Sequence, residues 1–201
     1  MLDSYALAEI WCRTLDLPAF SPALHERLRA ATLWLQAMMV TENGDVPNIG
    51  ANDGAWLLPL ADTDYRDFRP SLQLAAVLFA GARAVAAPGV WDQPLLWLGV
   101  DRPEAVLPAP GSVTLDDGGF HILRAGTAMA VLRYPRFRFR PSQADALHLD
   151  LWLGGRNLLR DAGSFSYASE DGVWFGGTSA HNTVEFDGRD QMPRLRRFLF
   201  G

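Results

Sequence analysis

The sequence contains no lysine, only one cysteine and no apolar run of the ~20 residues that a membrane-spanning helix needs. Its 18 basic residues are therefore all arginines, and 23 acidic residues outnumber them, which gives a formal net charge of −5 at pH 7. An acidic chain without a basic stripe does not fit a nucleic-acid-binding protein. The single Cys12 excludes an intrachain disulfide, and no membrane span is predicted.

The residues that are present predict a folded globular protein. Hydrophobic residues make up 49% of the chain and charged residues 20%, whereas disordered chains combine low hydrophobicity with high charge. The N-terminal segment carries acidic residues early and lacks the basic region that begins a secretory signal. No signal peptide is therefore expected in this chain.

The first half of the chain has the apolar spacing of helices, in which apolar residues recur every three or four positions. This spacing predicts four helices, over 3–17, 22–39 and 70–87 and within 93–99. Ser21 is expected to cap the second helix, and Pro22 suits its first position. The first helix is expected to bury the face formed by Leu7, Ile10, Trp11 and Leu15.

Residues 41–70, between the second and third helices, lack helical spacing. Loops longer than ~12–15 residues inside a compact domain are usually functional or disordered. This loop has too many large apolar residues for a disordered linker, among them Trp56, Leu57, Leu58, Tyr65 and Phe68. We expect an ordered loop that lines a cleft.

The apolar spacing changes near residue 106, and the second half of the chain has the alternation typical of strands. Strands are predicted over 118–126, 128–134, 146–153, 157–163 and 181–188. A hairpin turn is expected at Gly154–Gly155. In 146–153 the leucines face one side and His148 and Asp150 face the other, where they either meet solvent or line a cleft. Helices followed by antiparallel strands predict an α+β fold.

Four segments carry longer motifs in addition to this periodicity. They are NGDVPNIGANDGAWLLPL, DYRDFRPSLQLA, PSQADALHLDLWLGGRNLLRDAGSFSY and SAHNTVEFDGRDQ. Together they resemble the heparinase II/III-like family of polysaccharide lyases, and the last two are the most specific. The resemblance implies an incomplete (α/α) toroid followed by an antiparallel β-sandwich. We therefore expect residues 1–106 to be the C-terminal part of the toroid and residues 107–201 the N-terminal part of the sandwich.

The resemblance implies an activity as well, because family members cleave uronic-acid-containing polysaccharides by β-elimination. That reaction needs a group that neutralises the uronate carboxylate, a base for the C5 proton and an acid for the leaving oxygen. The implied partner is an acidic polysaccharide, and the implied location is the cell envelope or periplasm. The family's catalytic tyrosine and its Asn or His partner would fall before Met1 in our alignment. We therefore expect a fragment that lacks portions of its own fold and is inactive alone.

The resemblance further implies a divalent metal, calcium or zinc, in the sandwich. The family's ligand positions fall on Gln143, Asp161 and His181. Asp161 and His181 suit such cations, whereas the amide of Gln143 replaces a histidine and favours calcium-like chemistry. The family's proton-transfer histidine falls at Pro141, which leaves His148 as the catalytic candidate. Without a metal, Asp161 would be a turn residue and His181 would bond a backbone carbonyl.

The candidate substrate-binding residues lie in the long loop and at its end. Asn52 and Asp53 either form turns or hold sugar hydroxyls at a cleft edge. Arg66 and Arg69 either form a structural ion pair with Asp67 or pair with a uronate carboxylate. A second arginine group either is a solvated strand face or attracts an acidic polysaccharide; it comprises Arg133, Arg136, Arg138 and Arg140.

Two other function classes remain open. One is a non-catalytic carbohydrate-binding or scaffold protein with the same fold, which the loss of the family histidines at Pro141 and Gln143 favours. The other is a toroid glycoside hydrolase, which needs paired carboxylates across a cleft. Asp53, Asp62, Asp64 and Asp67 could supply them. A lyase leaves an unsaturated product that absorbs ultraviolet light, a hydrolase gives only new reducing ends, and a binding protein gives neither.

Overall fold

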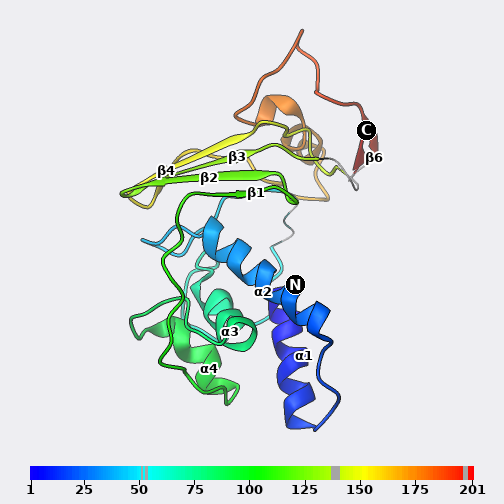
Figure 1. The fold of residues 1–201 in the computed structure, drawn as a ribbon. Coiled ribbons are helices and arrows are strands. Elements are labelled where there is room, and N and C mark those ends of the chain that lie inside the picture. The colour runs from blue at the N-terminus through cyan, green and yellow to red at the C-terminus, as the bar shows by residue number, and fades with distance from the viewer. Residues whose placement is uncertain (51, 53, 137–140, 197–198) are drawn as a thin grey trace. The chain divides into compact units, whose positions relative to one another are not determined.

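The computed structural model describes residues 1–50, 52, 54–136, 141–196 and 199–201. The chain divides into two compact units (Figure 1). The first unit comprises residues 1–39, 43–45 and 56–110, and the second comprises residues 40–42, 46–55 and 111–201. None of the helices in the described part of the chain is long and apolar enough to cross a membrane.

The first unit is helical. Its elements are α1 (Leu2–Thr14), α2 (Pro22–Met38), α3 (Arg69–Ala80), the 3-10 turn η1 (Val90–Asp92) and α4 (Gln93–Trp97). The side chain of Ser21 accepts a hydrogen bond from the Leu24 backbone N–H, which confirms the predicted cap of α2. The core of the unit consists of Ala6, Leu28, Leu74, Ala75, Leu78, Phe79 and Leu95.

The predicted buried face of the first helix is wrong for Trp11 and Leu15, whereas Ile10 does pack against the core. Trp11 and Leu15 are 62% and 65% exposed, whereas Ala6 and Glu9 are buried. Ala6 belongs to the core cluster together with residues of α3, so the side of α1 that carries Ala6 faces the core. Trp11 lies five positions from Ala6 and therefore about 140° around the helix. Leu15 lies just beyond the last helical residue.

The third helix ends at Ala80, well before the predicted end at residue 87. Gly81 adopts the left-handed conformation (φ 65°) that terminates helices. Arg83 instead pairs with Val106 in a parallel bridge, in which the Arg83 carbonyl accepts from Leu107 N–H at 2.8 Å. The buried Gln73 side chain accepts from the backbone N–H groups of 84 and 85, both at 2.9 Å, and so holds the extended segment against α3.

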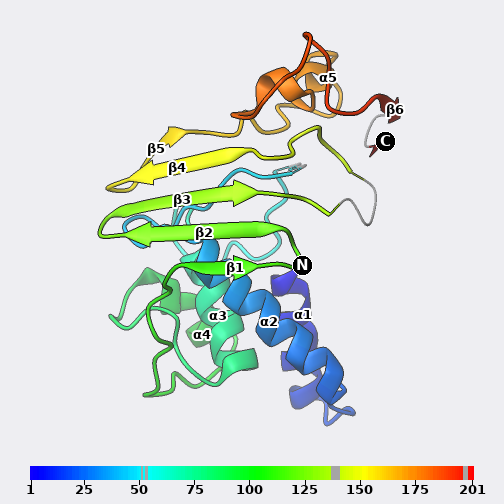
Figure 2. The ribbon, with the colours of Figure 1, turned by 45° about the horizontal axis from the view of Figure 1, so that its top comes forward.

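The second unit contains a five-stranded antiparallel sheet, which confirms the α+β class (Figure 2). Its strands follow chain order: β1 (Val113–Leu115), β2 (Phe120–Ala125), β3 (Ala128–Arg133), β4 (Leu149–Leu153) and β5 (Arg156–Leu159). Gly154 and Gly155 both have positive φ, and they form the predicted hairpin turn. Shorter elements follow: α5 (Asp171–Phe175), the 3-10 turn η2 (Thr178–Ala180), β6 (Arg194–Arg196) and β7 (Leu199–Phe200).

Two predicted strands differ from the structure. The strand predicted over 157–163 ends at Leu159. The segment 181–188 is not a strand: its residue Phe186 forms a single bridge to Arg189 around a turn at Asp187–Gly188, where both φ values are positive (53° and 64°). Two successive left-handed residues reverse the chain and end any extended run.

In and next to β4 the polar residues are buried and leucines are exposed, which is the reverse of what an alternating strand usually shows. His148, Asp150 and Trp152 are buried, whereas Leu147 and Leu153 are each 51% exposed. The alternative that placed His148 and Asp150 on the solvent side is therefore wrong. Buried polar groups need polar partners, and each of His148, Asp150 and Trp152 has one buried side-chain atom without a hydrogen-bond partner.

Candidate functional site

Two histidines and an aspartate form a buried cluster in the second unit, which we call the His/Asp cluster. His148, Asp161 and His181 each place a potential ligand atom within 4.8 Å of the others. Their exposed fractions are 1%, 0% and 8%. Nδ1 of His181 lies 3.1 Å from Oδ2 of Asp161, and Nε2 of His148 lies 3.8 Å from the same oxygen. The two imidazole rings meet edge to face, with centroids 5.5 Å apart.

The β4–β5 hairpin and Asn182 bring the cluster together. His148 directly precedes β4 and Asp161 follows β5, so the antiparallel hairpin places the two residues at the same end. The side-chain amide of Asn182 donates to the carbonyls of Leu149 (3.2 Å) and Arg160 (3.1 Å). This amide therefore ties the segment after η2 to both hairpin strands, and the neighbouring His181 is held against the other two residues.

A tight turn fixes the carboxylate of Asp161. Its Oδ1 accepts a hydrogen bond from Gly163 N–H at 2.7 Å, as in the turn role considered from the sequence. Gly163 has a φ of +79°, and a Cβ there would lie 2.3 Å from Nδ2 of Asn48. Only glycine fits this conformation and this space. The turn leaves Oδ2 of Asp161 pointing at the two histidines.

The cluster contains buried polar atoms without hydrogen-bond partners. They include Nε2 of His148, Nε2 of His181 and Oδ2 of Asp150. Asp150 lies beside the cluster: its Oδ2 is 3.8 Å from Nε2 of His148, and its Oδ1 accepts from Asn157 Nδ2 at 2.6 Å. Leaving a buried polar group unpaired costs about 1–3 kcal/mol. Three such atoms in one place favour a bound cation that would satisfy them.

The backbone determines the tautomer of His148. Nδ1 of this ring accepts a hydrogen bond from Asn182 N–H at 3.2 Å. A neutral imidazole has one donor and one acceptor nitrogen, so the proton resides on Nε2, which faces Asp150 and Asp161. For Nε2 of His148 to ligate a metal, that proton must move to Nδ1, and the hydrogen bond from Asn182 must break.

A third buried acid, Asp145, lies near the cluster. It pairs with Nη1 of Arg133 and is fully buried. Burial raises the pKa of the Asp145 carboxyl, and the charges of Arg133 and His181 oppose that rise. Asp145, Asp150 and Asp161 bring three carboxyl groups close to the single guanidinium of Arg133. This excess of acidic groups favours a bound cation.

The donor set suits a metal ion of the zinc type. Two imidazoles and one carboxylate are common zinc ligands. Structural zinc sites have four protein ligands, whereas three protein ligands leave a fourth coordination position for another group. The cluster could therefore hold a metal, with the proton shift on His148 as the structural requirement.

The structure brings together three of the predicted site residues and separates the fourth. Asp161 and His181 meet in the cluster, and His148, predicted as catalytic, is the third member. Gln143, predicted as a ligand, lines a pocket whose lining does not include these three residues. His148 was not expected as a ligand because the sequence offered no way to see that the hairpin would place it beside Asp161.

The predicted substrate-binding residues make structural contacts. Asn52 forms a turn, because its Oδ1 accepts from Gly54 N–H at 2.9 Å. Arg66 pairs with Asp45, its Nε 2.8 Å from Oδ1. Arg69 pairs with Asp67 at 2.7 Å. Asp53 lies outside the described residues.

The second arginine group is described only in part. Arg133 pairs with the buried Asp145, and Arg136 pairs with the exposed Asp116. Arg138 and Arg140 lie outside the described residues. The described members are thus engaged in ion pairs, and the question of a basic strand face remains a prediction.

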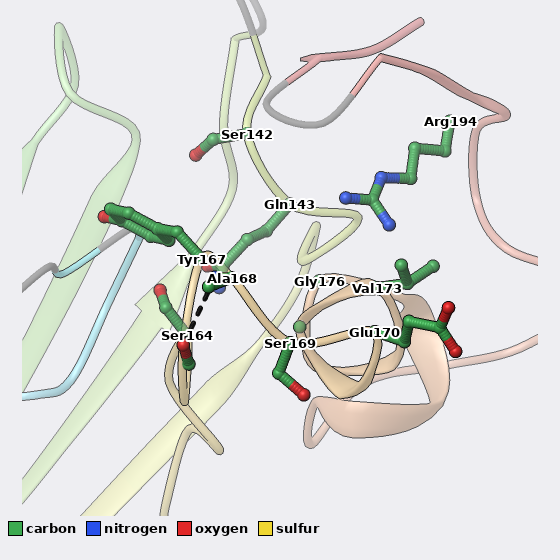
Figure 3. Close-up of a pocket in the computed structure, with 12 residues that line it drawn as sticks. Ser142, Gln143, Ser164, Tyr167, Ala168, Ser169, Glu170, Val173, Gly176 and Arg194 are labelled. Atoms are coloured by element: carbon green, nitrogen blue, oxygen red, sulfur yellow. Dashed lines mark hydrogen bonds between the residues drawn. The ribbon is translucent and has the colours of Figure 1, made fainter.

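A pocket lies beside α5 in the same unit (Figure 3). Its volume is about 180 Å³. The walls come from residues 142–143, from the loop 164–170, from α5 and its C-cap, and from Arg194. Sequence reasoning missed this pocket, because its walls come together from residues 142–143, 164–176 and 194, which are separated along the chain.

Comparison with known proteins finds a family model that is similar to the C-terminal half of the chain. Residues 107–201 match the family model described as heparinase II/III-like, C-terminal. A heparin-sulfate lyase from Bacteroides stercoris is 32% identical over 109 residues, which is 49% of this chain and 16% of that protein. The chain therefore spans about a sixth of the length of this curated relative.

Solved structures share the fold. A heparinase III structure matches with a TM-score of 0.58 and 20% identity, over 93% of this chain and 29% of that one. The heparan sulfate lyase HepC from Pedobacter heparinus matches with a TM-score of 0.56 and 19% identity, over 86% of this chain and 25% of that one. Such low identity supports the fold, while the family model supports the relationship. Residues 107–201 are thus similar to the C-terminal part of the heparinase II/III-like family.

Proposed function

We propose that this chain is part of a polysaccharide lyase that cleaves an acidic, uronic-acid-containing polysaccharide by β-elimination in the cell envelope. The family relationship supports the lyase class. The observation that carries the role of this part is the buried His/Asp cluster inside the family-matched unit. Its burial assigns it to holding the fold rather than to touching substrate.

In this proposal the cluster binds a divalent metal of the zinc type through His148, Asp161 and His181. The bound ion would cross-link the β4–β5 hairpin to the segment after η2. His148 then acts as a ligand, not as a proton-transfer group, because its side chain is only 1% exposed and both of its nitrogens face protein groups. Gln143 is left out of this ligand set.

The metal proposal has a direct spectroscopic test. Ligation by Nε2 of His148 moves the ring proton to Nδ1, so the Asn182 N–H loses its acceptor. We expect nitrogen NMR to show the tautomer change when zinc is added, and the Asn182 amide to exchange faster with solvent. Zinc binding with the Asn182 amide unchanged would mean that His148 is not a ligand through Nε2.

The 201-residue chain is proposed to be inactive alone. The resemblance places the family's proton-transfer tyrosine and its partner outside these residues, and Pro141 occupies the position of a family histidine. The test is incubation with heparan sulfate, chondroitin sulfate and alginate while ultraviolet absorbance and reducing ends are followed. We expect neither signal from this chain and ultraviolet absorbance from a longer chain that carries the tyrosine segment. Absorbance from the 201 residues alone would contradict the proposed inactivity.

A non-catalytic carbohydrate-binding protein is the second candidate. The replacement of family histidines by Pro141 and Gln143 favours it. This candidate predicts binding of the same polysaccharides without an unsaturated product from either chain. The glycoside hydrolase alternative predicts new reducing ends without ultraviolet absorbance. The same assay therefore separates all three functions.

A further inference from the structure

We propose that the pocket beside α5 binds a single hexuronate ring of the polysaccharide, with Gln143 as its buried hydrogen-bond acceptor. The choice of a uronic acid rests on the proposed function, whereas the existence of a ligand rests on the pocket. Figure 3 shows Gln143, Tyr167, Glu170 and Arg194 around the cavity.

Gln143 is the strongest sign of a missing ligand. It is only 3% exposed, it lines the pocket, and its Oε1 has no hydrogen-bond partner. Its position is fixed by the neighbouring residue, because Ala144 N–H donates to the Gly176 carbonyl at 2.9 Å. A hydroxyl group placed beside this amide would supply the donor that the oxygen lacks. A sugar hydroxyl is such a donor.

The opposite wall is held in place before any ligand binds. Ser169 Oγ donates to Asp171 Oδ2 at 3.0 Å and accepts from Asp171 N–H at 3.1 Å. Ser166 Oγ accepts from Ala168 N–H at 3.2 Å. Gly172 packs so tightly against this loop that a Cβ there would lie 2.5 Å from the Ser166 carbonyl oxygen. A wall fixed by its own hydrogen bonds loses little conformational freedom when a ligand binds.

Size and chemistry select the ligand class. The volume of about 180 Å³ offers room for a small polar group such as one sugar ring. The polar lining provides hydroxyl groups, the Glu170 carboxylate and the Arg194 guanidinium, and Val173 adds an apolar surface. Hydroxyls of a pyranose can pair with Gln143 and Glu170. A guanidinium in the wall favours a ring that also carries a carboxylate.

The test is titration of the full chain with sodium glucuronate and, separately, with glucose, followed by NMR. We expect glucuronate to bind more tightly than glucose, with shifts confined to the pocket. Gln143→Leu should weaken glucuronate binding about tenfold, because it removes the acceptor and keeps the size. Arg194→Met should remove the preference for glucuronate. Arg189→Met, a change at an exposed ion pair outside the pocket lining, should alter neither.

Thermal melting and zinc titration of Gln143→Leu separate a damaged fold and a metal role from a sugar role. The variant should melt no lower than the native chain, because an unsatisfied buried polar atom is replaced by an apolar group. Its zinc affinity should be unchanged. Unchanged glucuronate binding, or a loss of zinc affinity in its place, would overturn the assignment. The lyase proposal would survive that result, because it is tested by product formation from the longer chain.

Discussion

The ion pair between Arg133 and Asp145 offers the sharpest test of how the second unit tolerates its buried charges. Asp145 is fully buried and its side chain accepts no hydrogen bond, so the Arg133 guanidinium is the group that compensates its charge. Arg133, at the end of β3, is itself largely buried and lies over the Phe120 ring at 5.9 Å. Arg133→Met keeps the length and apolar contacts of the side chain and removes only the charge.

The expected loss follows from the burial of the remaining partner. Breaking a buried pair by removing one member destabilises a protein by about 3–5 kcal/mol, since the other charge stays buried and unpaired. For a chain of this length 1 kcal/mol corresponds to roughly 2–4 °C in melting temperature, so Arg133→Met should lower it by about 6–20 °C. Replacing both members, Arg133→Met with Asp145→Leu, should recover most of this loss, because no unpaired charge remains.

Thermal melts of the single variants and the double variant form the assay. The matched control is Arg136→Met, which removes an arginine from the pair with Asp116 on the surface. Solvent screens that pair, so its loss should be much smaller. If Arg133→Met melts no lower than Arg136→Met, or if the double variant is as unstable as the single one, the argument from burial is refuted.

Three further predictions concern the His/Asp cluster, the buried carboxyl of Asp3 and the turn at Gly163. Asp161→Asn should lower zinc affinity by more than the ~10–100-fold that loss of an outer-shell partner costs, as measured by calorimetry with exposed Asp101→Asn as control. Burial raises the pKa of the Asp3 carboxyl above the ordinary aspartate value of about 4. The protonated Asp3 therefore stabilises the folded chain below that value, and this contribution is lost as pH rises through the folded-state pKa. Asp3→Asn should therefore gain stability over the native chain between pH 3 and pH 7 in denaturant titrations, and an equal difference at both pH values would contradict this. Gly163→Ala should destabilise by more than about 1 kcal/mol, because its Cβ would lie 2.3 Å from a side-chain amide, whereas Gly126→Ala shares the positive φ but meets nothing within 4 Å and should melt higher than Gly163→Ala.

Secondary structure was predicted correctly from the sequence where one residue type determines the local backbone conformation. Ser21 caps α2, and the Gly154–Gly155 pair makes the β4–β5 turn. The same rule also explains an error: Gly81 ends α3, but apolar spacing alone suggested that the helix continues. After Gly81 the chain instead forms a single bridge between Arg83 and Val106, and that pairing joins residues far apart in the sequence.

Burial was harder to predict than secondary structure, because it depends on what packs against each face. Alternation in 146–153 separated the leucines from His148, Asp150 and Trp152 but could not say which set is inside. The structure buries His148, Asp150 and Trp152, and partners come from other elements: Asn157 donates to Asp150, and the Asn182 backbone N–H donates to His148. None of these partners is recognisable from the sequence of β4 itself.

The assignment of the metal ligands shows the same limit of prediction from sequence. Motif spacing assigns ligands by position along the chain, and it pointed to Gln143, whereas a metal requires donor atoms that converge in space. The register of the β4–β5 hairpin and the Asn182 bonds place His148 beside Asp161 and His181. If His148 supplies the third ligand, the replacement of the family histidine by glutamine loses no metal site. Gln143 is then free for a different contact, and its unpaired oxygen in the wall of a sugar-sized pocket is the reason to look for that contact there.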